Sequence, residues 1–138
     1  MKAKYFKIPE RFHQSISIRK DTLSYFDDDW HYHSQQELVY ILKGTGTRFI
    51  GDNISRFKNG DLILLGSNLP HVWKSDKQYF STDSNEKVSA IVLHFPLNFG
   101  GDEFWKLPEM TSIKKLLHLS HMGINYTLPP PASNKEAN

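Results

Sequence analysis

Short apolar or alternating segments, each ended by turn-forming residues, recur along the chain as far as residue 95. They predict β-strands over residues 15–19, 23–26, 30–43, 47–50, 54–57, 61–65, 71–74 and 87–95. Glycine- or asparagine-containing turns at 44–46, 51–53 and 58–60 predict hairpins between neighbouring strands. Turns at this spacing are typical of an antiparallel sandwich or barrel and not of alternating strands and helices.

The pattern changes after the last predicted strand. Apolar residues then recur at helical spacing over 110–119, after one expected helical turn at 102–106. The final residues are rich in proline and small polar side chains, which indicates a flexible tail or linker. These features predict three parts: a barrel with an N-terminal arm over 1–100, a helical segment over 101–123, and a tail or linker over 124–138.

The strand predicted over 30–43 carries an unusual set of polar residues. Side chains alternate between the two faces of a strand, so His31, His33 and Glu37 share a face if the strand has no bulge. Val39 and Ile41 continue that face, which makes it the buried one. A buried polar group without a partner costs about 1–3 kcal/mol. A Zn, Ni, Fe or Mn ion would supply the missing partner, because imidazole and carboxylate groups bind these metals.

A fourth metal-ligand candidate is His71, which two hairpins can bring back beside the first three. Three histidines and one carboxylate would leave coordination positions open for water or a ligand. Other side chains are candidates for contacting a small ligand. Aromatic rings suit a pocket wall, a guanidinium holds a carboxylate or phosphate, and a histidine lies on the strand predicted over 87–95; these candidates are Tyr40, Trp73, Arg48 and His94.

Composition narrows the classes of protein. The length of 138 residues suits one domain, and a net charge of +2 is too small to argue for nucleic-acid binding by this chain. There is no cysteine, so disulfides and thiolate metal sites are excluded. The sequence has no apolar run of membrane-spanning length and no signal-peptide core near its N-terminus. We therefore expect a cytoplasmic protein without membrane contact.

The spacing of the polar residues resembles that of the cupins. The run His31-x-His33-x3-Glu37-x6-Gly44 matches the first cupin motif, and Gly60 and His71 match part of the second. Other turn residues of both motifs differ. The resemblance implies an all-β cupin fold, a double-stranded β-helix or jelly-roll-like barrel, followed by one or two short helices. It also implies that the two matched histidines, Glu37 and His71 are the positions where cupins bind a metal.

Within the cupins, two stretches resemble the N-terminal sensor domain of AraC-type transcription regulators. They are HYHSQQELVYILKGTGTRFIGD at 31–52 and FKNGDLILLGSNLPHVW at 57–73. The resemblance implies a small-molecule effector, such as a sugar or metabolite, and a homodimer in which the helix over 110–119 takes part. It also implies control of DNA binding by a C-terminal helix-turn-helix domain, which we do not find after residue 95. Residues 1–14 are the candidate for a mobile arm.

Two other functions are compatible with these residues. The first is a metal-dependent cupin enzyme, either a dioxygenase or a sugar isomerase, that uses the same three histidines and Glu37. We expect no enzymatic activity, because the sequence patterns reveal no second carboxylate or general base. The second is a dimerisation module with an empty barrel.

Overall fold

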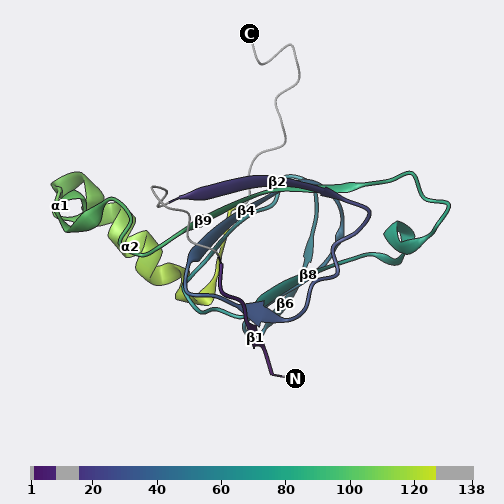
Figure 1. The fold of residues 1–138 in the computed structure, drawn as a ribbon, viewed down its shortest axis with the longest axis horizontal. Coiled ribbons are helices and arrows are strands. Elements are labelled where there is room, and N and C mark those ends of the chain that lie inside the picture. The colour runs from purple at the N-terminus through teal and green to yellow at the C-terminus, as the bar shows by residue number, and fades with distance from the viewer. Residues whose placement is uncertain (1, 9–15, 127–138) are drawn as a thin grey trace, which may run out of the picture.

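The computed structural model describes residues 2–8 and 16–126, and they form two five-stranded sheets that face each other (Figure 1). The strands are β1 (Lys4–Tyr5), β2 (Ser17–Leu23), β3 (His31–Tyr32), β4 (Gln36–Lys43), β5 (Gly46–Ile50), β6 (Asn53–Phe57), β7 (Leu62–Leu65), β8 (His71–Ser75), β9 (Val88–Phe95) and β10 (Ile124–Tyr126). One sheet has the order β1-β3-β8-β5-β6 and the other β10-β7-β4-β9-β2. The predicted all-β barrel is therefore confirmed.

Strand alternation places the apolar core between the two sheets. On β4 the side chains of Val39 and Ile41 are buried beside their cross-strand neighbours Ile63 and Ala90 of the same sheet. Ile50 and Phe57 of the opposite sheet belong to the same core. Alternate residues of β4 point outward. Burial of these branched apolar side chains, each worth about 1.5–3 kcal/mol, holds the two sheets together.

Two of the three predicted hairpins are wrong. Residues 51–53 do join a paired hairpin, β5–β6. Residues 44–46 and 58–60 instead carry the chain from one sheet to the other, so β4 does not pair with β5 and β6 does not pair with β7. Turn-forming residues predict a change of direction, but the partner of a strand depends on burial across the whole barrel.

Three predicted strands also differ. The segment 30–43 is interrupted at 33–35, so β3 and β4 belong to different sheets. The segments predicted as 15–19 and 23–26 are replaced by one strand, β2, which pairs along its whole length with β9. The break at 33–35 lets the chain turn the corner between the two sheets.

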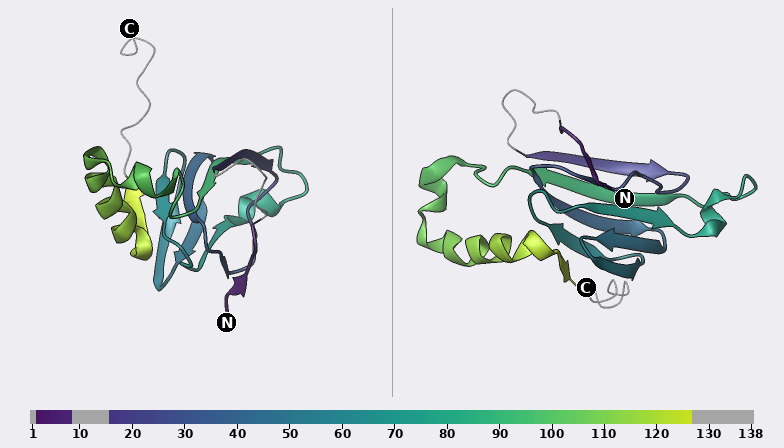
Figure 2. Two further views of the ribbon diagram at one scale, coloured as in Figure 1. Left: turned by 60° about the vertical axis from the view of Figure 1, so that its left-hand side comes forward. Right: turned by 90° about the horizontal axis from the view of Figure 1, so that it is seen from below.

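Two short α-helices follow the barrel, together with 3-10 turns. They are α1 (Gly101–Trp105) and α2 (Thr111–Leu119), with η2 (Pro108–Met110) and η3 (Ser120–Met122). Another 3-10 turn, η1 (Lys77–Phe80), lies earlier in the chain between β8 and β9. The helix predicted over 110–119 is therefore confirmed. Figure 2 shows α1 and α2 projecting from one end of the barrel. Among the described residues, no helix is long and apolar enough to cross a membrane.

Helix α2 covers the outer face of the sheet β10-β7-β4-β9-β2 only loosely. None of its side chains is fully buried. A cavity of about 490 Å³ separates it from the sheet, and only apolar side chains line this cavity, including Leu38, Leu64 and Leu93 of the sheet and Leu116 of the helix. The outer face of this sheet is therefore apolar beneath α2.

The predicted part boundary at residue 124 needs a correction. Residues 124–126 form β10, which pairs with β7 and extends the sheet, so they are not a tail. The rest of the predicted tail, 127–138, lies outside the described residues. Of the predicted arm, residues 4–5 form β1, parallel to β3, whereas residues 1 and 9–14 are not described.

Candidate functional site

Four histidines and one glutamate gather inside the barrel. His31 on β3 lies directly opposite His71 on β8, and Glu37 on β4 lies directly opposite His94 on β9. His33 comes from the segment that turns the corner between β3 and β4. Apart from His31, which is half-buried, these residues are 5% exposed or less. The predicted residues His31, His33, Glu37 and His71 are thus brought together, although their strand is not continuous.

The Glu37 carboxylate lies at the centre of this cluster. Its Oε1 is 2.5 Å from His94 Nε2 and 3.5 Å from His33 Nε2, and its Oε2 is 3.3 Å from His71 Nε2. The ring centroids of His31 and His71 are 4.4 Å apart, and those of His33 and His71 are 5.0 Å apart. Three imidazoles therefore surround one carboxylate, and the fourth imidazole, that of His31, packs against the ring of His71.

Three of the imidazoles are held in one tautomer by the backbone. Nδ1 of His31, His33 and His71 lies 2.6–2.9 Å from the carbonyl oxygens of residues 29, 35 and 69 respectively. A carbonyl only accepts hydrogen bonds, so each Nδ1 carries the proton and each neutral ring keeps a lone pair on Nε2. Among the described residues, Nε2 of His33 and of His71 is buried without a hydrogen-bond partner.

This arrangement fits a divalent transition metal. Metal-binding histidines commonly donate the other ring N–H to a backbone carbonyl, which orients the ring and raises its basicity. The ligand atoms of His31, His33 and His71 lie within 4.8 Å of one another, and so do those of His33, Glu37 and His94. The cluster therefore has the donor types and spacing of a metal site.

Electrostatics keeps the glutamate charged. Burial alone would raise the pKa of Glu37, but its close contacts with His33, His71 and His94 outweigh burial and hold the pKa well below its ordinary value of 4.5. Burial lowers the pKa of His71, but the nearby Glu37 carboxylate outweighs burial and raises that pKa above 6.5. Burial lowers the pKa of His31. The negative charge of Glu37 thus lies among imidazole nitrogens, and the site as a whole attracts a metal ion or a proton.

The middle of the chain matches a known domain. Residues 26–79 match the model described as "Cupin domain". The fold is that of the cupins. No curated protein matches the sequence. The chain is similar in structure to ToxT from Vibrio cholerae (TM-score 0.52, 14% identity, covering 85% of this chain and 44% of that chain).

Two further solved structures resemble this chain. One is ToxT from Vibrio cholerae O395 bound to (E)-4-(8-methylnaphthalen-1-yl)but-3-enoic acid (TM-score 0.53, 13% identity, 84% of this chain and 43% of that chain). The other is a cupin protein from Bacteroides fragilis (TM-score 0.48, 14% identity, 60% and 67%). ToxT is an AraC-family regulator, so the predicted resemblance to that family's cupin domain is confirmed. The chain spans less than half of the ToxT chain.

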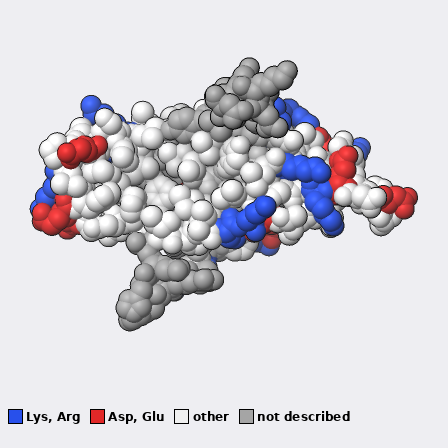
Figure 3. Space-filling model, turned by 90° about the horizontal axis from the view of Figure 1, so that it is seen from above, with Lys and Arg blue, Asp and Glu red and all other residues white. Residues whose placement is uncertain are grey.

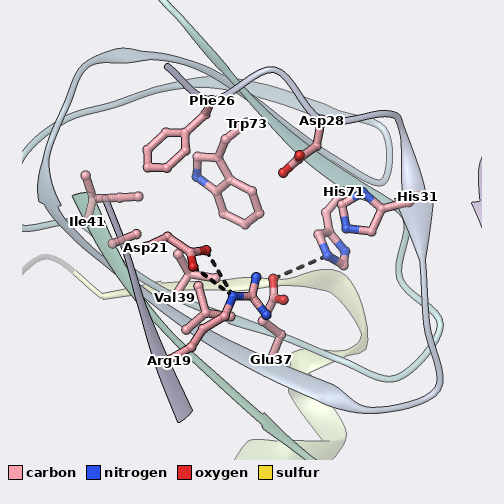
Figure 4. Close-up of a pocket in the computed structure, with 12 residues that line it drawn as sticks. Arg19, Asp21, Phe26, Asp28, His31, Glu37, Val39, Ile41, His71 and Trp73 are labelled. Atoms are coloured by element: carbon pink, nitrogen blue, oxygen red, sulfur yellow. Dashed lines mark hydrogen bonds and ion pairs between the residues drawn. The ribbon is translucent and has the colours of Figure 1, made fainter. Parts of the chain in front are cut away.

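A small cavity of about 60 Å³ adjoins the cluster in this cupin barrel (Figure 4). His31, Glu37 and His71 form one wall, and Trp73 lies near them, with its buried Nε1 lacking a hydrogen-bond partner among the described residues. A volume of this size holds a metal ion with a few water molecules, or a small part of a larger ligand.

Sequence patterns missed three polar residues of this cavity: Arg19, Asp21 and Asp28. Arg19 Nε donates to both carboxylate oxygens of Asp21, at 3.0 and 3.1 Å. They alternate on β2 with Ile18, whose side chain is 69% exposed, so the charged face of this strand points inward. Asp28 lies in the acidic turn before β3. Only the pairing of β2 with inward-facing residues of β9 reveals these positions.

The predicted ligand-contacting residues lie in different places. Trp73 lines the cavity, and His94 contacts Glu37. Arg48 lines a separate cavity of about 320 Å³ near β6 and β10, where its Nη1 is 3.4 Å from Asp61 Oδ2. Tyr40 belongs to the outward face of β4, so the structure does not bring it to the cluster. Contact of Trp73 and His94 with a ligand stays a prediction.

Proposed function

We propose that this cupin domain is the ligand-sensing part of an AraC-type transcription regulator, which binds a small molecule in the barrel and has no enzymatic activity. The observation that supports the proposal is the cavity at the histidine–glutamate cluster. Buried polar atoms there, on His33, His71 and Trp73, lack partners among the described residues. A bound molecule that satisfies them removes a desolvation cost of about 1–3 kcal/mol each.

The chemistry of the cavity favours an effector that carries oxygen atoms. His31, His33, Glu37 and His71 would hold a divalent metal, and that metal would supply a Lewis-acid position for a hydroxyl or carboxylate oxygen. Trp73 Nε1 is a hydrogen-bond donor beside the cluster. The ToxT structure with a bound carboxylic acid supports an acid or a sugar acid as one class to test.

The N-terminal strand offers a way to transmit binding. Lys4 N donates to Trp30 O, and Phe6 N donates to Tyr32 O, so β1 is attached to β3 beside the cluster. The Phe6 ring lies 5.0 Å from the His31 ring, centroid to centroid. An effector larger than the cavity would displace β1 from β3. If the effector binds the protein with different affinities in the two positions of β1, that difference is sufficient for control.

The described residues do not provide a DNA-binding part for the proposed regulator. Among these, the helices are too short to form tandem helix-turn-helix units. On the face shown in Figure 3, most charged side chains lie towards the two ends. They form no continuous basic band over the described part of this face. We propose that DNA contact occurs through a helix-turn-helix domain elsewhere in the regulator, which acts as a homodimer in the cytoplasm.

Thermal-shift titration tests the sensor proposal. The wild type is screened against sugars and small carboxylic acids, with and without Zn²⁺, Ni²⁺, Mn²⁺ or Fe²⁺. At least one compound should raise the unfolding midpoint, since a ligand of the native state stabilises it. The shift should shrink in Trp73→Phe and persist in Trp30→Phe, which alters a tryptophan that does not line the cavity. Absence of any stabilising compound argues against a sensor.

A metal-dependent enzyme is the second candidate, and one observation favours it. Asp21 and Asp28 line the same cavity as Glu37, so carboxylates suited to proton transfer are present there. Dioxygen uptake and sugar isomerisation by the metal-loaded protein discriminate between the two functions. We expect neither activity. If the wild type shows turnover and Glu37→Gln does not, the result would support the enzyme and contradict the sensor proposal.

A further inference from the structure

His94 differs from the other three histidines of the cluster in how its ring is held. It lies directly across from Glu37 on the neighbouring strand, and its Nε2 is 2.5 Å from Glu37 Oε1. A carboxylate oxygen accepts the hydrogen bond, so Nε2 of His94 carries the proton. The other ring atom, Nδ1, is buried and has no hydrogen-bond partner among the described residues.

The three other rings have the opposite tautomer. In His31, His33 and His71 the proton is on Nδ1, directed to a backbone carbonyl two residues away. Their Nε2 lone pairs are available to a metal, whereas the Nε2 of His94 is occupied by the contact with Glu37. The ligand atoms of His31, His33 and His71 are close enough together for a metal, and so are those of His33, Glu37 and His94. Only in the first set does every histidine have a free Nε2 lone pair.

We propose that His94 is a positioning residue that holds Glu37 as a metal ligand and does not itself bind the metal. This inference rests on the proposed metal site. The contact holds Oε1 and leaves Oε2 facing His71 at 3.3 Å. A glutamate side chain otherwise samples several rotamers, and a short charge-assisted hydrogen bond from a buried donor restricts it to one. Loss of such an outer contact commonly lowers metal affinity about 10–100-fold.

Cobalt titration of the metal-free protein tests this role. His94→Phe keeps an aromatic ring but removes the N–H, whereas His94→Gln places an amide N–H where it can donate to Glu37. We expect His94→Phe to bind Co²⁺ about 10–100-fold more weakly than wild type, with one ion per chain and an unchanged visible spectrum. His94→Gln should restore most of the affinity. The matched control is His118→Phe, an exposed histidine on α2, which should bind as the wild type does.

Specific outcomes would overturn the inference. If His94 is a ligand, both His94 variants lose a nitrogen donor and the cobalt spectrum changes in both. Unchanged affinity in His94→Phe also contradicts the positioning role, and it leaves the metal site itself intact. A wild type that binds no Co²⁺ removes the metal site and this inference together, while the effector screen above still tests the sensor.

A measurement on the wild type covers the case in which a variant does not fold. Nitrogen-15 spectra of the metal-free protein distinguish the two imidazole tautomers. The inference requires the proton of His94 on Nε2 and those of His33 and His71 on Nδ1. The same tautomer in all three rings would overturn it.

Discussion

His31 and His71 lie directly opposite each other on the antiparallel strands β3 and β8, with ring centroids 4.4 Å apart. This register joins two segments 40 residues apart in sequence into one ligand set. We expect His71→Ala to lower the affinity for Zn²⁺ by at least about tenfold, because the buried Nε2 is a donor that no neighbour replaces. Competition with a coloured chelator measures this affinity, with His118→Ala as the control. Equal affinity in both variants would remove His71 from the site.

Gly46 allows strands β5, β6 and β8 to approach closely. A Cβ added there would lie 2.1 Å from the carbonyl oxygen of Lys74 and 2.7 Å from the Phe57 ring. We expect Gly46→Ala to lower the free energy of unfolding by about 3 kcal/mol or more, since neither the backbone nor a buried ring can yield. Urea denaturation measures the loss.

The control for this substitution separates crowding from backbone strain. Gly101 has φ +81°, but an added Cβ there meets no atom within 4 Å. Gly101→Ala should therefore cost only the left-handed backbone strain, about 1–2 kcal/mol. A Gly46→Ala protein as stable as the Gly101→Ala protein would show that β5 moves to accommodate the methyl group.

Two isoleucines should differ strongly in their contribution to stability. Ile41 on β4 is 1% exposed in the core, whereas Ile113 on α2 is 41% exposed beside the apolar cavity. We expect Ile41→Ala to lower the free energy of unfolding by about 2–5 kcal/mol and Ile113→Ala by less than about 1 kcal/mol. Denaturant unfolding of both proteins checks this. A similar loss at both positions would indicate that α2 packs more tightly than described.

Asp76 should make the stability of the folded protein depend on pH in the acidic range. Its carboxylate accepts hydrogen bonds from Arg56 and from Thr45 Oγ1 at 2.8 Å, and the contact with Arg56 is the main reason that the pKa of Asp76 lies below its ordinary 3.8. The native state thus binds this proton less tightly than the unfolded chain does. The stabilisation is present above pH 3.8 and is lost as the pH falls through the lower native value.

Asp76→Asn should therefore flatten the acid side of the stability curve. The effect is small, because the pair is largely exposed to solvent and screened. Thermal midpoints between about pH 5 and pH 2 measure it, with Asp83→Asn, an exposed acid on the next loop, as the control. An unchanged slope in Asp76→Asn would show that the ion pair does not persist in solution.

The four predicted metal ligands do converge, but for a different physical reason. Side-chain alternation would place His31, His33 and Glu37 on one face only if they lay on one straight strand. In the structure the chain leaves one sheet after β3 and enters the other at β4, and His33 lies on the corner between them. The side chains meet because that corner wraps around the barrel interior. Spacing along a sequence does not distinguish these two geometries.

Arg19 and Asp21 show why part of the polar lining of the cavity is not predictable from the sequence. Alternation divides a strand into two faces but does not say which one points inward. On β2 the apolar residue Ile18 points outward, whereas the charged residues Arg19 and Asp21 line the cavity on the other face. An apolar outer face is tolerated on this sheet because α2 covers part of it. Hydrophobicity alone therefore does not identify the inner face.

The pairing of β2 and β4 with β9 also has a consequence for the speed of folding. Ser17 pairs with His94, and Glu37 pairs with the same residue, so the sheet that carries the glutamate closes only after its last long strand arrives. Contacts so distant in sequence slow the search for the native topology, and barrels of this kind fold in milliseconds to seconds. During synthesis, the cluster cannot assemble until the ribosome has released the segment that contains β9.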